Sequence, residues 1–127
     1  MVNKEKLEND EMIKKIAKEA VLALDDKKGE DIKIIDISEV SVIADYFIIA
    51  SGNNQNQIQR MADEVEERIH KMGLSLKQVE GYETANWILM DFSDVIVHIF
   101  NKENRLFYDL ERIWRDGRIM DMKDFLQ

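Results

Sequence analysis

The spacing of apolar residues changes along this chain between helical and strand periods, and these changes predict its elements. Over residues 10–28 apolar positions recur every three or four residues, which predicts an amphipathic helix that ends before Gly29. The same spacing returns over residues 55–72, ahead of Gly73, and again over residues 101–116. We therefore expect three helices, each with one buried face.

Between these stripes the chain contains short runs rich in β-branched and aromatic residues, which are typical of strands. The five runs are residues 32–37, 46–51, 76–80, 87–91 and 95–100. The last two are separated by Phe92-Ser93-Asp94, which has the length of a hairpin turn. The predicted order is α-β-β-α-β-β-β-α, which favours an α/β fold with one mixed five-stranded sheet and its helices mainly on one face.

The alternation within the run at residues 95–100 bears on the other face of that sheet. Side chains of a strand point to opposite faces in turn, and both sets here are mainly apolar. One set is Val95, Val97 and Ile99, and the other is Ile96, His98 and Phe100. We therefore expect a contiguous apolar patch on the face away from the helices, and such patches mark interaction sites.

Length and composition limit the class of protein. The chain has 127 residues with no cysteine and no proline, which suits one domain over residues 1–127, with a core over residues 10–117 and a C-terminal tail over residues 118–127. The longest uninterrupted apolar stretch, residues 46–50, is far too short to span a bilayer. With no targeting signal in the N-terminal residues, we expect a cytoplasmic protein.

The formal net charge of −8 argues against a protein that reads nucleic acid directly, since phosphate binding needs a basic face. A basic protein partner fits this charge better. Candidate catalytic chemistry is sparse, because the chain has only two histidines, in different predicted elements, and no cysteine. A zinc site and a cysteine–histidine pair are therefore not expected.

Two short segments each allow a functional and a structural interpretation. Residues 51–54, Ser-Gly-Asn-Asn, lie between a predicted strand and a helix N-terminus, where backbone N–H groups either bind an anion or simply turn the chain and cap the helix. Asp91 and Asp94 flank the predicted hairpin turn. They either hold a magnesium ion or act as ordinary turn formers, and we favour the structural interpretation in both cases.

Aromatic residues offer better candidates for contact with a partner. Trp87 opens a strand directly after the polar loop Thr84-Ala85-Asn86, so we expect it to be only partly covered, as an interface anchor or as a core residue. His98 is a candidate contact residue or a plain sheet residue. Tyr108 lies off the apolar stripe of the third predicted helix, so its hydroxyl group is expected to be accessible.

Several blocks, taken together and in order, resemble the Iojap/RsfS family of ribosomal silencing factors. The resemblance runs from about residue 10 to Trp114, and the tail after Gly117 falls outside it. The blocks are IADYFIIASG at residues 43–52, VEG at 79–81, WILMD at 87–91, DVIVHIF at 94–100 and LERIW at 110–114.

The resemblance implies a nucleotidyltransferase-like α/β fold and a translation repressor without a cofactor or a metal. It implies binding to the large ribosomal subunit through ribosomal protein L-fourteen, which prevents the small subunit from joining, notably when nutrients are scarce. The family's contact surface lies on the sheet and its flanking segments. By matching blocks, it corresponds to Trp87, Leu89, Asp91, Asp94, His98 and Tyr108.

The implied fold also raises an alternative function, a nucleotide-binding enzyme. Nucleotidyltransferases place a Gly-Ser-type loop before a helix and a pair of acidic residues one residue apart on the next strand. Ser51-Gly52 is similar to that loop, but residues 76–80 offer only Glu80. Without paired carboxylates to hold two magnesium ions, we interpret the chain as non-catalytic. A homodimer formed through the same apolar face stays open.

Overall fold

The structure is a computed structural model, and it describes residues 4–103, 117–121 and 125–126. These residues form two helices and six strands in one mixed α/β arrangement. The elements in chain order are α1 (Lys4–Asp26), β1 (Glu30–Asp36), β2 (Tyr46–Gly52), α2 (Gln55–Lys71), β3 (Gln78–Glu80), β4 (Trp87–Asp91), β5 (Val95–Asn101) and β6 (Arg118–Ile119).

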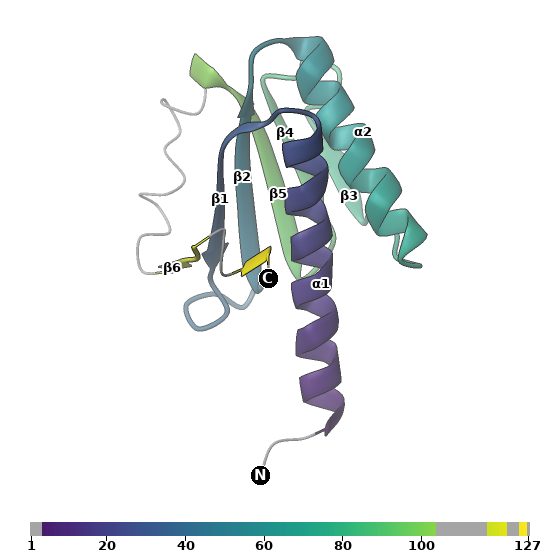
Figure 1. Cartoon of the computed structure of the whole chain (residues 1–127), viewed down its shortest axis with the longest axis vertical. Coiled ribbons are helices and arrows are strands. Elements are labelled where there is room, and N and C mark those ends of the chain that lie inside the picture. The colour runs from purple at the N-terminus through teal and green to yellow at the C-terminus, as the bar shows by residue number, and fades with distance from the viewer. Residues whose placement is uncertain (1–3, 104–116, 122–124, 127) are drawn as a thin grey trace.

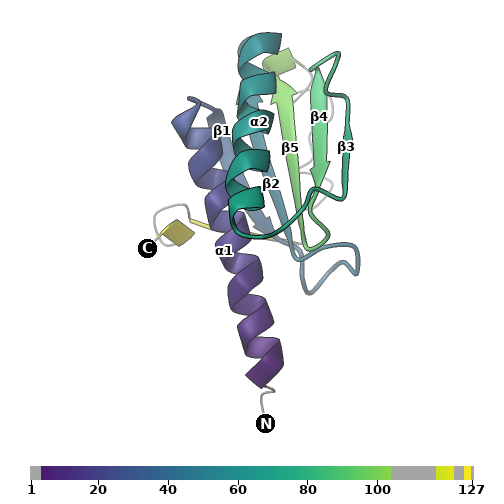
Figure 2. The same ribbon diagram turned by 90° about the vertical axis from the view of Figure 1, so that its right-hand side faces the viewer.

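The strands form a single sheet in the order β3-β4-β5-β2-β1-β6. Its neighbouring strands run antiparallel, except that β2 and β5 are parallel, with Ile48 opposite Val97. Helices α1 and α2 lie side by side against the same face (Figures 1 and 2). The predicted mixed sheet with its helices on one face is confirmed for the described residues.

The predicted number of five strands is wrong, because β6 adds a sixth at the edge. Ile119 pairs with Ile35 and Arg118 pairs with Asp36. A two-residue strand has no periodicity that a sequence pattern can reveal, so only its pairing with β1 defines it. The Met120 N–H continues this association by donating to the Ile34 carbonyl at 2.9 Å.

Residues beyond Gly117, expected to form a tail, also contribute to the core. Phe125 is 2% exposed, and its ring meets the Tyr46 ring edge-on with the centroids 5.9 Å apart. The third predicted helix, residues 101–116, lies almost wholly outside the described residues. Its first residue, Asn101, is the last residue of β5.

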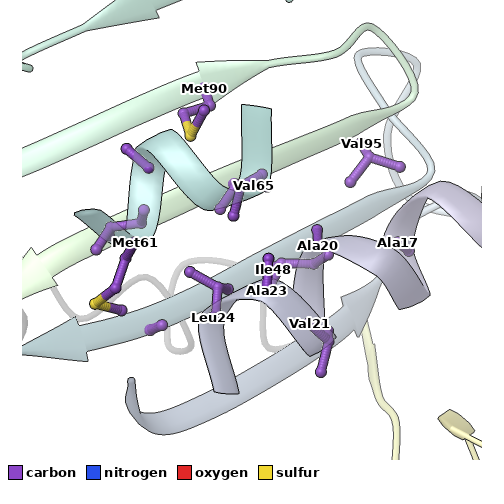
Figure 3. Close-up of a cluster of buried hydrophobic side chains, with 14 of the residues drawn as sticks. Ala17, Ala20, Val21, Ala23, Leu24, Ile48, Met61, Val65, Met90 and Val95 are labelled. Atoms are coloured by element: carbon purple, nitrogen blue, oxygen red, sulfur yellow. The ribbon is translucent and has the colours of Figure 1, made fainter. Parts of the chain in front are cut away.

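The main core lies between the helices and the sheet (Figure 3). The face of α1 turned toward this core is rich in alanine, and these small side chains let the helix approach β2 and α2 closely. From α2 and the strands, larger side chains fill the remaining space. The residues labelled in Figure 3 are Ala17, Ala20, Val21, Ala23, Leu24, Ile48, Met61, Val65, Met90 and Val95.

A second apolar cluster lies on the opposite face of the sheet. Its residues are Ile35, Ile37, Ala44, Phe47, Ile49, Ile96 and Phe100, each at most 8% exposed. The predicted contiguous exposed patch is therefore wrong, since most of this face is buried within the chain itself. Trp87 and Leu89 of β4 pack against the cluster but are only partly buried. Accessible apolar surface on this face is thus confined, among these residues, to β4.

Candidate functional site

Strand β4 places three of the predicted contact residues in a row. Trp87, Leu89 and Asp91 alternate with the fully buried Ile88 and Met90, so they share the face opposite the helices, and all three are partly exposed. Asp94 is exposed in the turn between β4 and β5. His98 lies directly opposite Leu89 on β5. Tyr108 lies outside the described residues.

Trp87 is held in place by the segments around it. Gly81 has a φ of +78°, and a Cβ atom at this position would lie 2.1 Å from the Trp87 carbonyl oxygen. Only glycine fits such a close approach in that conformation. On the other side, the Asn101 amide N–H donates to the Asn86 carbonyl and the Asn101 side-chain amide to the Asn86 side-chain oxygen, each at 3.0 Å. The start of β4 is therefore firmly positioned.

The Trp87 ring belongs to an aromatic cluster. It stacks on Phe100 with a centroid separation of 5.0 Å and an interplanar angle of 26°. Its indole Nε1–H donates a hydrogen bond to Nδ1 of His98 at 3.0 Å. The ring is thus fixed by stacking on one side and by a hydrogen bond at its edge, while part of it faces solvent. The sequence-based expectation that Trp87 is partly covered is confirmed.

His98 lies at the edge of this ring, next to the indole N–H. It is 3% exposed, and burial lowers the pKa of its imidazole from 6.5 to about 4. Because Nδ1 accepts the indole hydrogen bond, the proton of the neutral ring sits on Nε2, which is buried and has no hydrogen-bond partner in the described part of the chain. The Phe47 ring lies 4.8 Å from the imidazole, centroid to centroid. His98 is therefore buried, and its hydrogen bond to Trp87 links it to the partly exposed surface.

Asp91 and Asp94 shape the β4–β5 turn. The Asp91 carboxylate accepts a hydrogen bond from the Ser93 N–H at 2.7 Å, an Asx turn. The Asp94 carbonyl accepts from the N–H groups of Asp45 and Tyr46 at 2.8 and 3.1 Å. No cluster of three or more metal-ligating side chains occurs among the described residues. The geometry favours the turn-forming interpretation over a magnesium site.

The segment at residues 51–54 also has a structural role. The Asn54 side chain caps α2 by accepting from the Gln57 N–H at 2.8 Å, and the Gln57 side-chain oxygen accepts from the Asn53 N–H at 2.7 Å. A Cβ atom on Gly52 would lie 2.6 Å from Ile58, so this glycine lets α2 approach β2. Because these N–H groups already have partners, the geometry favours a turn and helix cap over an anion site.

Strand β3 lacks the acidic pair of a nucleotidyltransferase. Its two side chains on the Trp87 face are Gln78 and Glu80, which pair with Asp91 and Leu89 of β4. The Gln78 side-chain amide donates a hydrogen bond to the Glu80 carboxylate. One carboxylate bonded to a neighbouring amide differs from two carboxylates that share metal ions.

Sequence reasoning missed one accessible feature, the connection between β1 and β2 at residues 37–45. Val40, Val42 and Ile43 in this connection are 46%, 106% and 62% exposed. The available signal was three apolar residues within four positions, of which only Ile43 belongs to a block quoted for the family resemblance. These side chains lie at the same end of the sheet as Asp94, whose carbonyl bonds to the end of the connection.

The fold and the site together define a small α/β domain with a partly exposed aromatic and acidic surface, which is the kind of surface that binds another protein. Within the described residues, every helix is too short or too polar to cross a membrane.

Comparisons with known proteins place this domain. The sequence model of a family described as "Ribosomal silencing factor during starvation" matches residues 10–127. The ribosomal silencing factor RsfS of Bacillus subtilis is 41% identical over 109 residues, which cover 86% of this chain and 92% of that protein. The chain belongs to the ribosomal silencing factor family. One relative, a chloroplast protein from Arabidopsis thaliana, is named Iojap.

Two further relatives extend the comparison. A crystal structure of a protein from Chromobacterium violaceum superposes with a TM-score of 0.79 at 33% identity, covering 86% of this chain and 90% of that one. The mouse protein "Mitochondrial assembly of ribosomal large subunit protein 1" is 28% identical over 101 residues, 74% of this chain and 42% of that protein. The family match reaches residue 127, so the expectation that the segment after Gly117 falls outside the family is wrong.

Proposed function

We propose that this protein is a cytoplasmic ribosomal silencing factor. It binds the large ribosomal subunit through ribosomal protein L-fourteen, occupies space that the small subunit needs, and represses translation when nutrients are limiting. Support comes from membership of a family named for silencing during starvation and from a relative named for assembly of the large subunit. The name of the family describes regulation and no enzymatic reaction.

The single observation that carries the proposal is the partly exposed, fixed indole of Trp87. Large aromatic side chains that are rigid before binding contribute much buried area at a small entropic cost, so they are frequent hot spots. Trp87 is both stacked on Phe100 and hydrogen-bonded to His98, so it loses little freedom on binding. Leu89 continues the apolar surface along β4. His98 serves as a positioning residue, and Tyr108 is a further contact implied by the family resemblance.

Charge supports a basic partner. The chain has a formal net charge of −8, and Asp91 and Asp94 lie at the end of the Trp87 row. Exposed carboxylates around an apolar patch steer a basic surface toward it and raise the association rate. A basic protein of the ribosome fits this sign.

The proposed mechanism is steric and involves no covalent step. A factor that binds the free large subunit, and not the joined ribosome, opposes joining by mass action. At a free concentration of roughly 100 times its dissociation constant, the opposition amounts to about 2.7 kcal/mol. The concentration of the factor alone therefore controls the extent of silencing.

Two other functions compete with this one. A nucleotide-binding enzyme would follow from a nucleotidyltransferase-like fold, which stays a prediction. Against it, β3 supplies one carboxylate, and the Asn53 and Gln57 N–H groups at the start of α2 bond to side chains of the chain itself. A homodimer would use the same β4 surface and would compete with ribosome binding. Light scattering with and without large subunits separates dimerisation from the proposed function.

The test is co-sedimentation of the purified protein with large subunits, small subunits and joined ribosomes. We expect selective migration with large subunits and inhibition of joining, both weakened in Trp87→Ala. The matched control is Val79→Ala, which alters a residue 42% exposed on neighbouring β3 that pairs with Met90 and so faces the helix side. Equal binding by folded Trp87→Ala and wild type would overturn the assignment of the surface, and absence of wild-type binding would overturn the function.

A further inference from the structure

The β1–β2 connection displays more apolar surface than a loop of its length requires. Val42 is fully exposed, Ile43 is 62% exposed and Val40 is 46% exposed. One exposed aliphatic side chain is ordinary in a folded protein, whereas three within four positions form a patch. In both views the connection projects from the end of the sheet, clear of α1 (Figures 1 and 2).

Several hydrogen bonds order this connection. The Ile37 N–H donates to the Asp45 carbonyl at 2.8 Å and closes the base of the loop. Inside it, the N–H groups of Val40 and Ser41 donate to the Ile37 carbonyl, and the Ile43 N–H donates to the Ser41 hydroxyl oxygen at 3.0 Å. The exposed side chains are therefore presented on a formed loop, which lowers the entropic cost of binding through them.

The connection is continuous with the surface described for β4. The Asp94 carbonyl accepts hydrogen bonds from Asp45 and Tyr46, which joins the end of the connection to the β4–β5 turn. β4 has five residues, so Trp87 and Asp91 are about 13 Å apart along the strand. A standard interface of about 800 Å² per partner is roughly 30 Å across and covers both ends of such a strand.

The charges around the connection define the kind of partner. A recess at its base, on the side of the sheet that α1 covers, is lined by Asp36, Glu39, Asp45 and Tyr46 together with Ser38 and Asp10 of α1. Arg118 borders the adjoining recess, where it forms an ion pair with Asp36 at 3.2 Å. Aliphatic side chains with carboxylates beside them complement an apolar recess bordered by lysine or arginine.

We propose that the β1–β2 connection is the second half of the partner-binding surface. Val42 and Ile43 are its apolar anchors, and they enter an apolar recess bordered by basic residues on a protein of the large ribosomal subunit. This inference rests on the proposed function and extends its surface to two residues outside the contact set that the family resemblance implies.

The test compares a Val42→Ser/Ile43→Ser double variant with wild type in a binding titration against isolated large subunits. We expect affinity to fall by about tenfold or more, mainly through faster dissociation, because apolar anchors act after encounter. Thermal unfolding should be unchanged, since both side chains are exposed. The matched control is Val79→Ser. Val79 is an exposed valine on β3 that faces the helix side of the sheet, so this variant should bind as wild type does.

The possible outcomes distinguish failure of this inference from failure of the proposed silencing function. If wild type fails to bind large subunits, the proposed function falls and the inference falls with it. If wild type binds, Trp87→Ala weakens binding and the double variant binds as wild type does, only the inference is overturned. If instead the double variant abolishes a wild-type dimer seen by light scattering and leaves subunit binding intact, the patch serves self-association, which also overturns it.

Discussion

The indole Nε1–H of Trp87 donates a hydrogen bond to Nδ1 of His98 over 3.0 Å, and this bond links a partly exposed ring at the start of β4 to a buried ring at the centre of the sheet. Burial lowers the pKa of His98 to about 4, so its imidazole is neutral at pH 7 and Nδ1 is free to accept. The buried histidine thereby orients the tryptophan proposed to anchor the partner.

Replacing His98 tests this role. His98→Phe keeps an aromatic ring in the buried site and removes the acceptor, so we expect affinity for large subunits to fall roughly threefold to tenfold, the range of one neutral hydrogen bond. His98→Asn places a side-chain oxygen near the former Nδ1 position and should recover part of the loss. The measurement is a binding titration, with thermal unfolding recorded for each variant. Equal affinity of both variants and wild type would show that His98 does not position Trp87.

The same residue predicts a pH dependence of stability. The pKa of His98 is lowered in the folded state, to about 4 from 6.5, so between these values the unfolded chain binds more protons. Stability is therefore complete above about pH 6.5 and declines as the pH falls toward 4, and the loss between pH 7 and pH 5 is about 2 kcal/mol. Denaturant unfolding of wild type and His98→Phe at both pH values measures it.

The His98→Phe variant is the control for this measurement. His98→Phe retains every carboxylate of the chain, so it keeps whatever pH dependence those groups contribute and loses only the histidine contribution. A wild-type loss between pH 7 and pH 5 that matches the loss in His98→Phe would contradict the lowered pKa.

Gly81 provides a test of how Trp87 is positioned. Gly81→Ala combines an unfavourable φ of +78° with a Cβ atom 2.1 Å from the Trp87 carbonyl oxygen, so β4 or its preceding turn must shift. We expect a loss of more than about 2 kcal/mol of unfolding free energy, together with weaker binding to large subunits. Chemical denaturation and the binding titration provide the two measurements.

A matched variant isolates the steric part of that effect. Gly73 has a similar φ of +86°, but a Cβ atom there has nothing within 4 Å. It ends α2 in a Schellman motif, in which its own N–H donates to the His70 carbonyl and the Leu74 N–H to the Ile69 carbonyl. Gly73→Ala should therefore cost only about 1 kcal/mol and leave binding unchanged. Equal losses in both variants would mean that the contact with Trp87 is unimportant.

The acidic end of the surface predicts a kinetic effect. Asp94→Asn removes an exposed charge and leaves the Asp94 backbone carbonyl in place for Asp45 and Tyr46. We expect slower association with large subunits at low salt and a difference from wild type that shrinks as ionic strength rises, because salt screens exposed charges. Stopped-flow association over a salt series measures this. Association that is independent of salt in both proteins would rule out steering by Asp94.

Local patterns in the sequence determined the elements whose residues interact with near neighbours. The predicted strand at residues 87–91 coincides with β4, and the apolar stripe over residues 55–72 predicts α2 to within one residue at its C-terminal end. Helix periodicity, capping by Asn54 and the glycine after the last turn are properties of short segments, so the chain alone reveals them. The row Trp87, Leu89 and Asp91 follows in the same way from strand alternation.

Only the tertiary structure decided what depends on distant segments. β6 exists because Arg118 and Ile119 find the edge of β1, and the second face of the sheet is buried although its alternation predicted an open patch. The sequence offered His98 as a candidate contact residue, whereas the structure buries it next to Trp87. Val42 and Ile43 are residue types typical of a core, yet both are exposed to solvent. Burial is a property of packing between segments far apart in the chain, and a local pattern shows which residues are apolar without showing what covers them.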